Sequence, residues 1–312
     1  LATAGSTKEY YIKHSSQMFK FSVVLKKFET KVYFFLQLSN LQSNFAKKLL
    51  TIPAMNRTKG TQISALGEFG LIDRLTRTLP KHNATTLTAA GDDAAVIDLG
   101  DEALLLTTDM LTEGIDFDLS YFPLKHLGYK CVVRGVNDIL AMNATPQQIV
   151  VALGVSAKIM VEALDELYEG MRTAADELGV DIVGGDTTAS LTGLTITITA
   201  VGRARKEDIV YRTGAHEHDL ICITSNLGAA YMGLHLLERE KRVLKDVENP
   251  EPKFAGYEYL LERYLKPRAR KNVLDALREE GIRPTSMIDL SDGLASDLRQ
   301  ICQSSKCGAR IY

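Results

Sequence analysis

The chain has 312 residues, of which 45% are hydrophobic and 24% charged, the balance of an ordinary globular protein long enough for two domains. Its net charge of -2 gives no electrostatic reason to expect binding to nucleic acid or a membrane, and no apolar run of 18 or more residues predicts a membrane span. Four cysteines are too few for a disulfide framework, and free thiols predict a cytoplasmic protein.

The first 54 residues differ in composition from the rest. They carry eight Lys and two Glu, net +6, which leaves -8 for residues 55–312. Their apolar bursts are interrupted by lysines, unlike a secretory signal. Because Met55 opens a sequence that reads well on its own, we expect residues 1–63 to be an extension outside the main fold and poorly ordered.

From Leu66 onward, strand and helix patterns alternate. We expect a strand at 103–108 that ends at Asp109, and a helix over 123–142 with an apolar stripe. Strands at 148–155 and 194–201 and a helix at 161–178, ended by Gly179, follow from their periodicity. A brief strand at 181–184 should run into the sequence GGDTT.

A second unit begins near Arg203. The patterns predict strands at 219–224, 287–290 and 310–312, and helices at 228–240, 254–263, 268–280 and after Gly293. The last strand stops abruptly, so this domain is expected to be incomplete. The predicted fold class is therefore α/β (α+β), with one domain at 64–202 and a second, incomplete α/β domain at 203–312.

Seven aspartates stand at the ends of apolar runs, without a neighbouring Cys or His that could be a soft metal ligand. They are Asp92, Asp93, Asp109, Asp138, Asp186, Asp289 and Asp292. Ionised carboxylates are costly to bury unless they are paired or bind a cation. Oxygen-only donors favour a hard cation such as Mg²⁺ held together with phosphates. This pattern indicates phosphoryl transfer from a nucleotide.

Asp138 is the most informative of these residues, because its spacing from Cys131, Gly135 and Met142 places it in the apolar stripe of its helix. A carboxylate in that position indicates metal ligation. The alternative is a buried salt bridge to an Arg or Lys elsewhere in the fold.

The other motifs are weaker one by one. GDDAAV at 91–96 can be a solvated turn, and Ser291 or Asp292 in DLSDGL can be a helix N-cap. TTD at 107–109 offers two hydroxyls and an acid, and GGDTT at 184–188 gives backbone access to phosphate. The chain has no GxxxxGK[ST] loop, no GxGxxG after a strand and no protein-kinase HRD/DFG set, which favours a metal-dominated phosphate site.

The ordered set of motifs resembles the thiamine-monophosphate kinase family, over about residues 64–312. The segments that carry the likeness are GEFGLI at 67–72, GDDAAV, TTDM, VNDILAMN, GGDTT, YRTGA at 211–215, LKP at 265–267 and LSDGL. The resemblance implies a two-domain synthetase-like fold with a mixed-sheet first domain that forms a homodimer. It also implies transfer of the ATP γ-phosphoryl group to thiamine monophosphate with several Mg²⁺ ions and no covalent enzyme intermediate.

The resemblance also implies site residues. The matching metal positions are Asp93, Thr107, Thr108, Asp109, Asp138, Asp186, Asp289 and Asp292. The matching nucleotide-contacting positions are Gly185, Asp186, Arg212 and Ser291, with Tyr168 as a candidate for stacking on adenine. Asp116 stands where the family commonly has a substrate-contacting His, seven residues after Asp109.

Two alternatives of different classes stay open. Asn137-Asp138 is similar to the cyclo-ligase branch of the wider superfamily, so another ATP-dependent activity is one of them, either amidine cyclisation or selenophosphate synthesis. The other is a non-catalytic nucleotide-binding remnant. Product assays separate the first alternative from a kinase, and nucleotide binding without ADP formation identifies the second.

Overall fold

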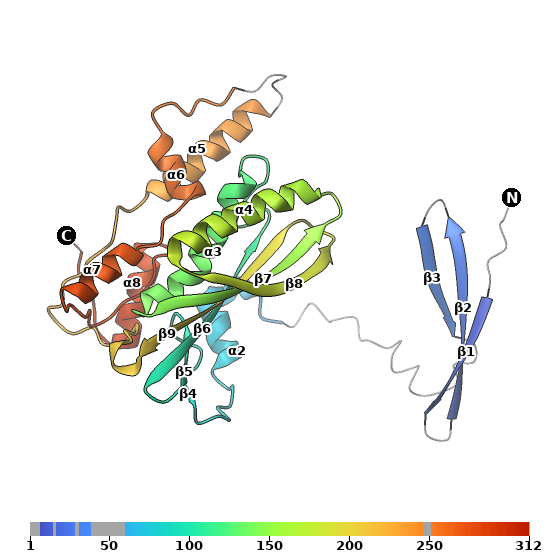
Figure 1. Cartoon of the computed structure of the whole chain (residues 1–312), viewed down its shortest axis with the longest axis horizontal. Helices are drawn as coiled ribbons and strands as arrows, with labels where there is room; N and C mark the ends of the chain where they lie inside the picture. The colour runs from blue at the N-terminus through green and yellow to red at the C-terminus, as the bar shows by residue number, and fades with distance from the viewer. Residues whose placement is uncertain are drawn as a thin grey trace. The chain divides into compact units, whose positions relative to one another are not determined.

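The computed structural model describes residues 7–14, 17–28, 31–38, 60–245, 247 and 251–311 (Figure 1). The chain divides into two compact units, Leu1–Thr78 and Leu79–Tyr312. We describe each unit by itself.

The first unit contains a three-stranded antiparallel sheet in the order β1-β2-β3. The strands are Thr7–His14, Gln17–Phe28 and Lys31–Leu38, and the 3-10 helix η1 (Ile63–Ala65) and α2 (Gly67–Thr76) follow. Regular elements before Leu66 were not expected from the sequence. The missed signal is the period-two alternation of Phe19, Phe21, Val23 and Leu25 in β2. The rest of the expected extension, including residues 39–59, lies outside the described residues.

The second unit is built on a six-stranded mixed sheet in the order β4-β5-β6-β9-β7-β8, which confirms the predicted mixed α/β fold class. Only the β7–β8 pair is parallel among these strands. Their bounds are Thr86–Thr88 (β4), Ala95–Asp98 (β5), Glu102–Thr112 (β6), Thr145–Ser156 (β7), Asp181–Ser190 (β8) and Thr195–Arg205 (β9).

Two strands are longer than their sequences predicted. Strand β6 does not end at Asp109, because it pairs with β9 as far as Thr112 opposite Thr195. Strand β8 does not end at Gly184 but includes the whole GGDTT segment, because its pairing with β7 continues to Ser190. Asp109 and Asp186 therefore lie within strands, where successive side chains point to opposite faces of the sheet.

Helices α3 (Leu124–Ala141) and α4 (Val161–Leu178) form as the apolar stripes predicted, and Gly179 ends α4 with a φ of 68°. Helix α3 contacts β6, β7 and β9, and α4 packs on α3. The two helices approach closely at two glycines, because an added Cβ at Gly128 would lie 1.9 Å from the Leu167 carbonyl oxygen and one at Gly170 would lie 1.8 Å from that of Lys125.

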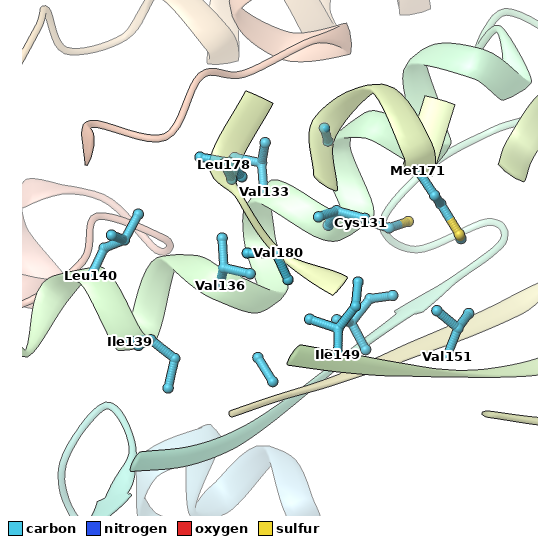
Figure 2. Close-up of a cluster of buried hydrophobic side chains, with 14 of the residues drawn as sticks. Cys131, Val133, Val136, Ile139, Leu140, Ile149, Val151, Met171, Leu178 and Val180 are labelled. Carbon is cyan, nitrogen blue, oxygen red and sulfur yellow. The ribbon is translucent and has the colours of Figure 1, made fainter. Parts of the chain in front are cut away.

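The main hydrophobic core fills the space between these helices and one face of the sheet. Figure 2 shows Cys131 and Val136 of α3, Ile149 and Val151 of β7 and Met171 of α4 within it. The opposite face of the sheet exposes apolar side chains, among them Leu106, Met110 and Val150. The sheet therefore has one covered face and one open face.

The remainder of the second unit is helical in the described residues: η2 (Lys206–Asp208), α5 (Ala229–Leu244), α6 (Glu258–Leu265), α7 (Lys271–Glu279) and α8 (Leu294–Ser305). The strands predicted at 219–224, 287–290 and 310–311 are wrong, and Tyr312 lies outside the described residues. A strand needs a neighbour that pairs with it along its length, and in the described residues these segments form no such ladder, although the Met287 N–H donates to the Tyr211 carbonyl oxygen. Leu220 is accordingly 90% exposed, and Cys222 is exposed as well.

Among the described residues, no helix combines the length and the apolar character needed to cross a bilayer.

Candidate active site

Side chains from three parts of the first half of the second unit lie near two segments that come much later in the chain. Asp93 precedes β5, Thr107 and Asp109 lie on β6, and Asp138 lies on α3 above that strand. Arg212 and Asp289, more than 70 residues further on, hydrogen-bond to this region. We call Asp93, Asp109, Asp138 and Asp289 the carboxylate cluster.

Asp138 is held on the covered face of the sheet by a hydroxyl. The Oγ1 of Thr107 donates to Oδ2 of Asp138 at 2.6 Å. Burial raises the pKa of Asp138 to about 7, and the nearby charges of Asp289 and Asp109 raise it further, against the Thr107 hydrogen bond. Among the described residues no Lys or Arg forms an ion pair with Asp138, so the salt-bridge alternative is wrong for this part of the chain.

Asp93 is buried and paired with Arg212. The Nε of Arg212 donates to Oδ1 of Asp93 at 2.9 Å, and Nη2 contacts the same oxygen. Burial raises the pKa of Asp93 to about 7, which the Arg212 charge opposes. The second oxygen, Oδ2, is buried and has no hydrogen-bond partner among the described residues. Asp93 therefore has one carboxylate oxygen whose desolvation is not compensated.

The adjacent Asp92 binds backbone N–H groups. Its carboxylate accepts from the backbone N–H of Arg212 at 3.2 Å and from that of Asp93 at 3.0 Å. It thus fixes the start of the YRTGA segment against the GDD turn. The GDDAAV segment is consequently a partly buried junction and not a solvated turn.

Arg134 forms ion pairs with two acids, one before and one after Thr112 in the sequence. Its Nε lies 2.7 Å from Oδ2 of Asp109, and its Nη1 donates to Oδ1 of Asp116 at 2.9 Å. Asp116 also accepts from the backbone N–H of Thr112 at 2.8 Å. Burial raises the pKa of Asp109, and the Arg134 charge lowers it. Arg134 is not among the site residues predicted from the sequence, although it lies one helical turn before Asp138 and therefore on the same side of α3.

Asp289 brings the DLSDGL segment into the cluster. Its Oδ2 accepts from Nδ2 of Asn137 at 3.3 Å, and burial raises its pKa. Its charge acts on Asp93, Asp109 and Asp138. Asp289 is thus the member of the carboxylate cluster that is electrostatically coupled to all the others, and Asn137 is a site residue to which the sequence assigned no role.

Other predicted site residues lie elsewhere. Thr108 points to the open face, where its hydroxyl lies 3.0 Å from that of Thr199. Asp186 is in register with Ala152 and, through Thr197, with Met110, which places it on the open face too. Strands β9 and β7 separate β8 from β6, so Asp186 is about 14 Å from β6, three inter-strand spacings.

Gly185 lies on the same cross-strand row as Asp109, through Ile198 and Val151. An added Cβ there would lie 1.7 Å from the Val151 carbonyl oxygen, so only glycine fits. Tyr168 of α4 is partly buried against the core.

Ser291 and Asp292 are exposed before α8. The N-cap of α8 is Gly293, whose N–H donates to Asp297 at 3.0 Å, so neither Ser291 nor Asp292 is the cap.

The carboxylate cluster fits a hard cation in its chemistry. All its donors are oxygens, their pKa values are raised, and the uncompensated Oδ2 of Asp93 is available as a ligand. Among the described residues, however, no three His, Cys, Asp or Glu side chains are already gathered closely enough to hold a metal ion. Arg134 and Arg212 pair instead with two of the acids.

The chain is similar in sequence to known kinases. Residues 91–204 match the family of the AIR synthase related protein, N-terminal domain. The thiamine-monophosphate kinase of Bacillus subtilis is 30% identical over 244 residues, 77% of this chain and 71% of the relative. That of Buchnera aphidicola subsp. Schizaphis graminum is 34% identical over 245 residues, covering 78% and 71%. The chain belongs to the thiamine-monophosphate kinase family.

Solved structures of thiamine-monophosphate kinases share the fold. A structure of AaThiL complexed with AMPPCP and TMP has a TM-score of 0.67 at 29% identity, covering 80% of this chain and 74% of that one. The thiamine monophosphate kinase of Aquifex aeolicus has a TM-score of 0.61 at 27% identity, covering 78% and 74%. The family assignment predicted from the ordered motifs is therefore confirmed.

Proposed function

We propose that this chain transfers the γ-phosphoryl group of ATP to thiamine monophosphate, giving thiamine diphosphate and ADP. The observation that carries the proposal is the carboxylate cluster with its two arginines, in a chain that belongs to the thiamine-monophosphate kinase family. Transfer between two phosphates needs positioning and charge neutralisation more than acid–base groups.

Each part of the cluster has a proposed task. Asp93, Thr107, Asp109, Asp138 and Asp289 would hold Mg²⁺, which would neutralise phosphate charge and orient the transferred group. Arg212 would contact the nucleotide phosphates. The hydrogen bond from Thr107 would fix the orientation of the Asp138 carboxylate, and that from Asn137 would fix the orientation of the Asp289 carboxylate. No residue is proposed as a general acid or base.

The residues outside the cluster are proposed for the periphery of the site. Gly185, Asp186, Ser291 and Tyr168 would contact the nucleotide, and Asp292 would add a metal ligand beside Asp289. Thr108 and Asp186 point to the open face. Thr108 and Asp186 could therefore bind only a metal ion that lies on the open face of the sheet.

We also propose a homodimer formed through the open face of the sheet. Its exposed Leu106, Met110 and Val150 support this, because apolar side chains exposed on a sheet face favour association. Met110→Lys is expected to convert the dimer to a 34.4 kDa monomer. Light scattering after gel filtration measures this. Ile115→Lys, at an exposed apolar residue outside the strands, is the control and should stay dimeric. A monomeric wild-type chain would contradict the proposal.

The domain boundaries proposed from the sequence remain 1–63, 64–202 and 203–312. Deleting residues 1–54 is expected to change the melting temperature of the catalytic unit by less than about 2 °C, since an extension adds little stability to a separate unit. Binding of Mg-ATP is also expected to be unchanged. Calorimetry measures the melting temperature, and titration with Mg-ATP measures the binding. A large drop in melting temperature would show that the extension stabilises the core.

We place the enzyme in the cytoplasm, where ATP and free thiols such as its four cysteines are found.

The acceptor assay separates the kinase from the cyclo-ligase alternative. Thiamine monophosphate and formylglycinamidine ribonucleotide are each offered with ATP and Mg²⁺, and ADP is followed. We expect ADP with thiamine monophosphate alone. ADP formation with the ribonucleotide alone would assign the chain to the cyclising branch, and ATP binding without ADP from either would make it a non-catalytic remnant.

A further inference from the structure

We propose that Arg134 binds the phosphate group of the acceptor, and that Asp109 and Asp116 position its guanidinium for this task. The inference rests on the proposed function and deepens it, because it assigns a specificity residue to the acceptor side of the transfer.

The geometry of Arg134 leaves donors free. A guanidinium carries five N–H groups in a fixed fork. In Arg134, Nε faces Asp109 and Nη1 donates to Asp116, while Nη2 makes no hydrogen bond to any described residue. The side chain as a whole is 38% exposed, so it is not sealed from a ligand. Two acids thus fix the plane of the fork, and its remaining edge has the geometry that recognises phosphate oxygens.

Arg212 is the less exposed of the two arginines, and it is assigned to the nucleotide phosphates instead. Its side chain is 20% exposed, and both Nε and Nη2 are directed at Oδ1 of Asp93. Arg212 therefore pairs with Asp93, before β5, whereas Arg134 pairs with Asp109 on β6 and with Asp116 after it, and the charge of Asp289 acts on both arginines. Phosphoryl transfer joins two phosphates, and two separate guanidinium groups beside one carboxylate cluster provide a cation for each.

The pairing also gives Asp116 a role. A bare carboxylate would repel an acceptor phosphate, but Asp116 is compensated by Arg134 and by the N–H of Thr112. Asp116 is therefore a positioning residue that acts through Arg134. The acceptor that this pair selects is one with a terminal phosphate monoester, as opposed to the unphosphorylated alcohol.

The test compares binding of thiamine monophosphate with that of thiamine by calorimetric titration, in the presence of the ATP analogue AMPPCP and Mg²⁺. In the wild type, thiamine monophosphate should bind more tightly than thiamine. Arg134→Met should weaken binding of thiamine monophosphate at least about tenfold and leave thiamine unchanged, since the loss of a charge-assisted hydrogen bond affects only the phosphate. In turnover, KM for thiamine monophosphate should rise while KM for ATP changes less than about twofold.

Two further variants keep the test decisive. Arg134→Gln retains hydrogen-bonding capacity toward Asp109 and Asp116 without the charge, and it should show the same loss if Arg134→Met does not fold. Arg203→Met is the matched control, because it removes an exposed arginine that pairs with Glu102 on the same sheet. It should change the affinity for neither thiamine monophosphate nor thiamine. A folded Arg134 variant that keeps the wild-type preference for thiamine monophosphate would overturn the inference alone. A wild type that does not distinguish the two ligands would overturn the proposed function with it.

Discussion

Replacing Asp138 by Asn is expected to reduce turnover by at least about a thousandfold while leaving the free energy of unfolding unchanged or raised. The carboxylate lies on the covered face of the sheet, where burial and the charges of Asp289 and Asp109 raise its pKa to about 7. A raised pKa means that the fold disfavours the ionised form. The neutral amide removes that repulsion and still offers an oxygen to the Thr107 hydroxyl.

Steady-state kinetics and urea unfolding of the same preparations measure both effects. Asp165→Asn, on the exposed surface of α4, is the control and should alter neither. If Asp138→Asn unfolds at lower urea and keeps the Mg²⁺ dependence of the wild type, Asp138 is a structural residue and its assignment to the cation site is wrong.

Gly128→Val is expected to destabilise the second unit by about 3 kcal/mol or more. The added Cβ would lie 1.9 Å from the Leu167 carbonyl oxygen, a backbone atom that moves only if α4 moves. Because α3 carries both Asp138 and Arg134, the loss of this packing should also reduce activity.

Chemical unfolding of the variant measures this effect. Gly154→Ala is the matched control, because the nearest atoms to its new Cβ lie at 3.6 Å, an ordinary contact distance. An unfolding midpoint for Gly128→Val equal to that of the wild type would show that the α3–α4 packing tolerates a wider separation than the structure has.

Periodicity was sufficient to predict the elements that bury one face. The apolar stripe of α3 placed Asp138 on the side that contacts the sheet, and its partner proved to be a hydroxyl on β6. Strand ends were less predictable, because pairing decides them. Asp109 looked like a strand terminus in the sequence, yet β9 extends the pairing three residues beyond it.

The faces of the sheet could not be assigned from motifs alone. Thr107 and Thr108 are adjacent in the sequence, but only Thr107 reaches the carboxylate cluster, because neighbouring side chains on a strand point in opposite directions. Arg134 was missed for a different reason. An arginine within a helix is usually solvated, and only the tertiary structure shows that Asp109 and Asp116 converge on it.

Phosphorus NMR of a single reaction mixture distinguishes phosphoryl transfer to thiamine monophosphate from hydrolysis of ATP. The full chain is incubated with ATP, Mg²⁺ and thiamine monophosphate, and every phosphorus-containing product is quantified. We expect thiamine diphosphate and ADP in equal amounts, without accumulation of inorganic phosphate, since the γ-phosphoryl group passes directly to the acceptor. Release of inorganic phosphate with ADP and no thiamine diphosphate would contradict the proposed function.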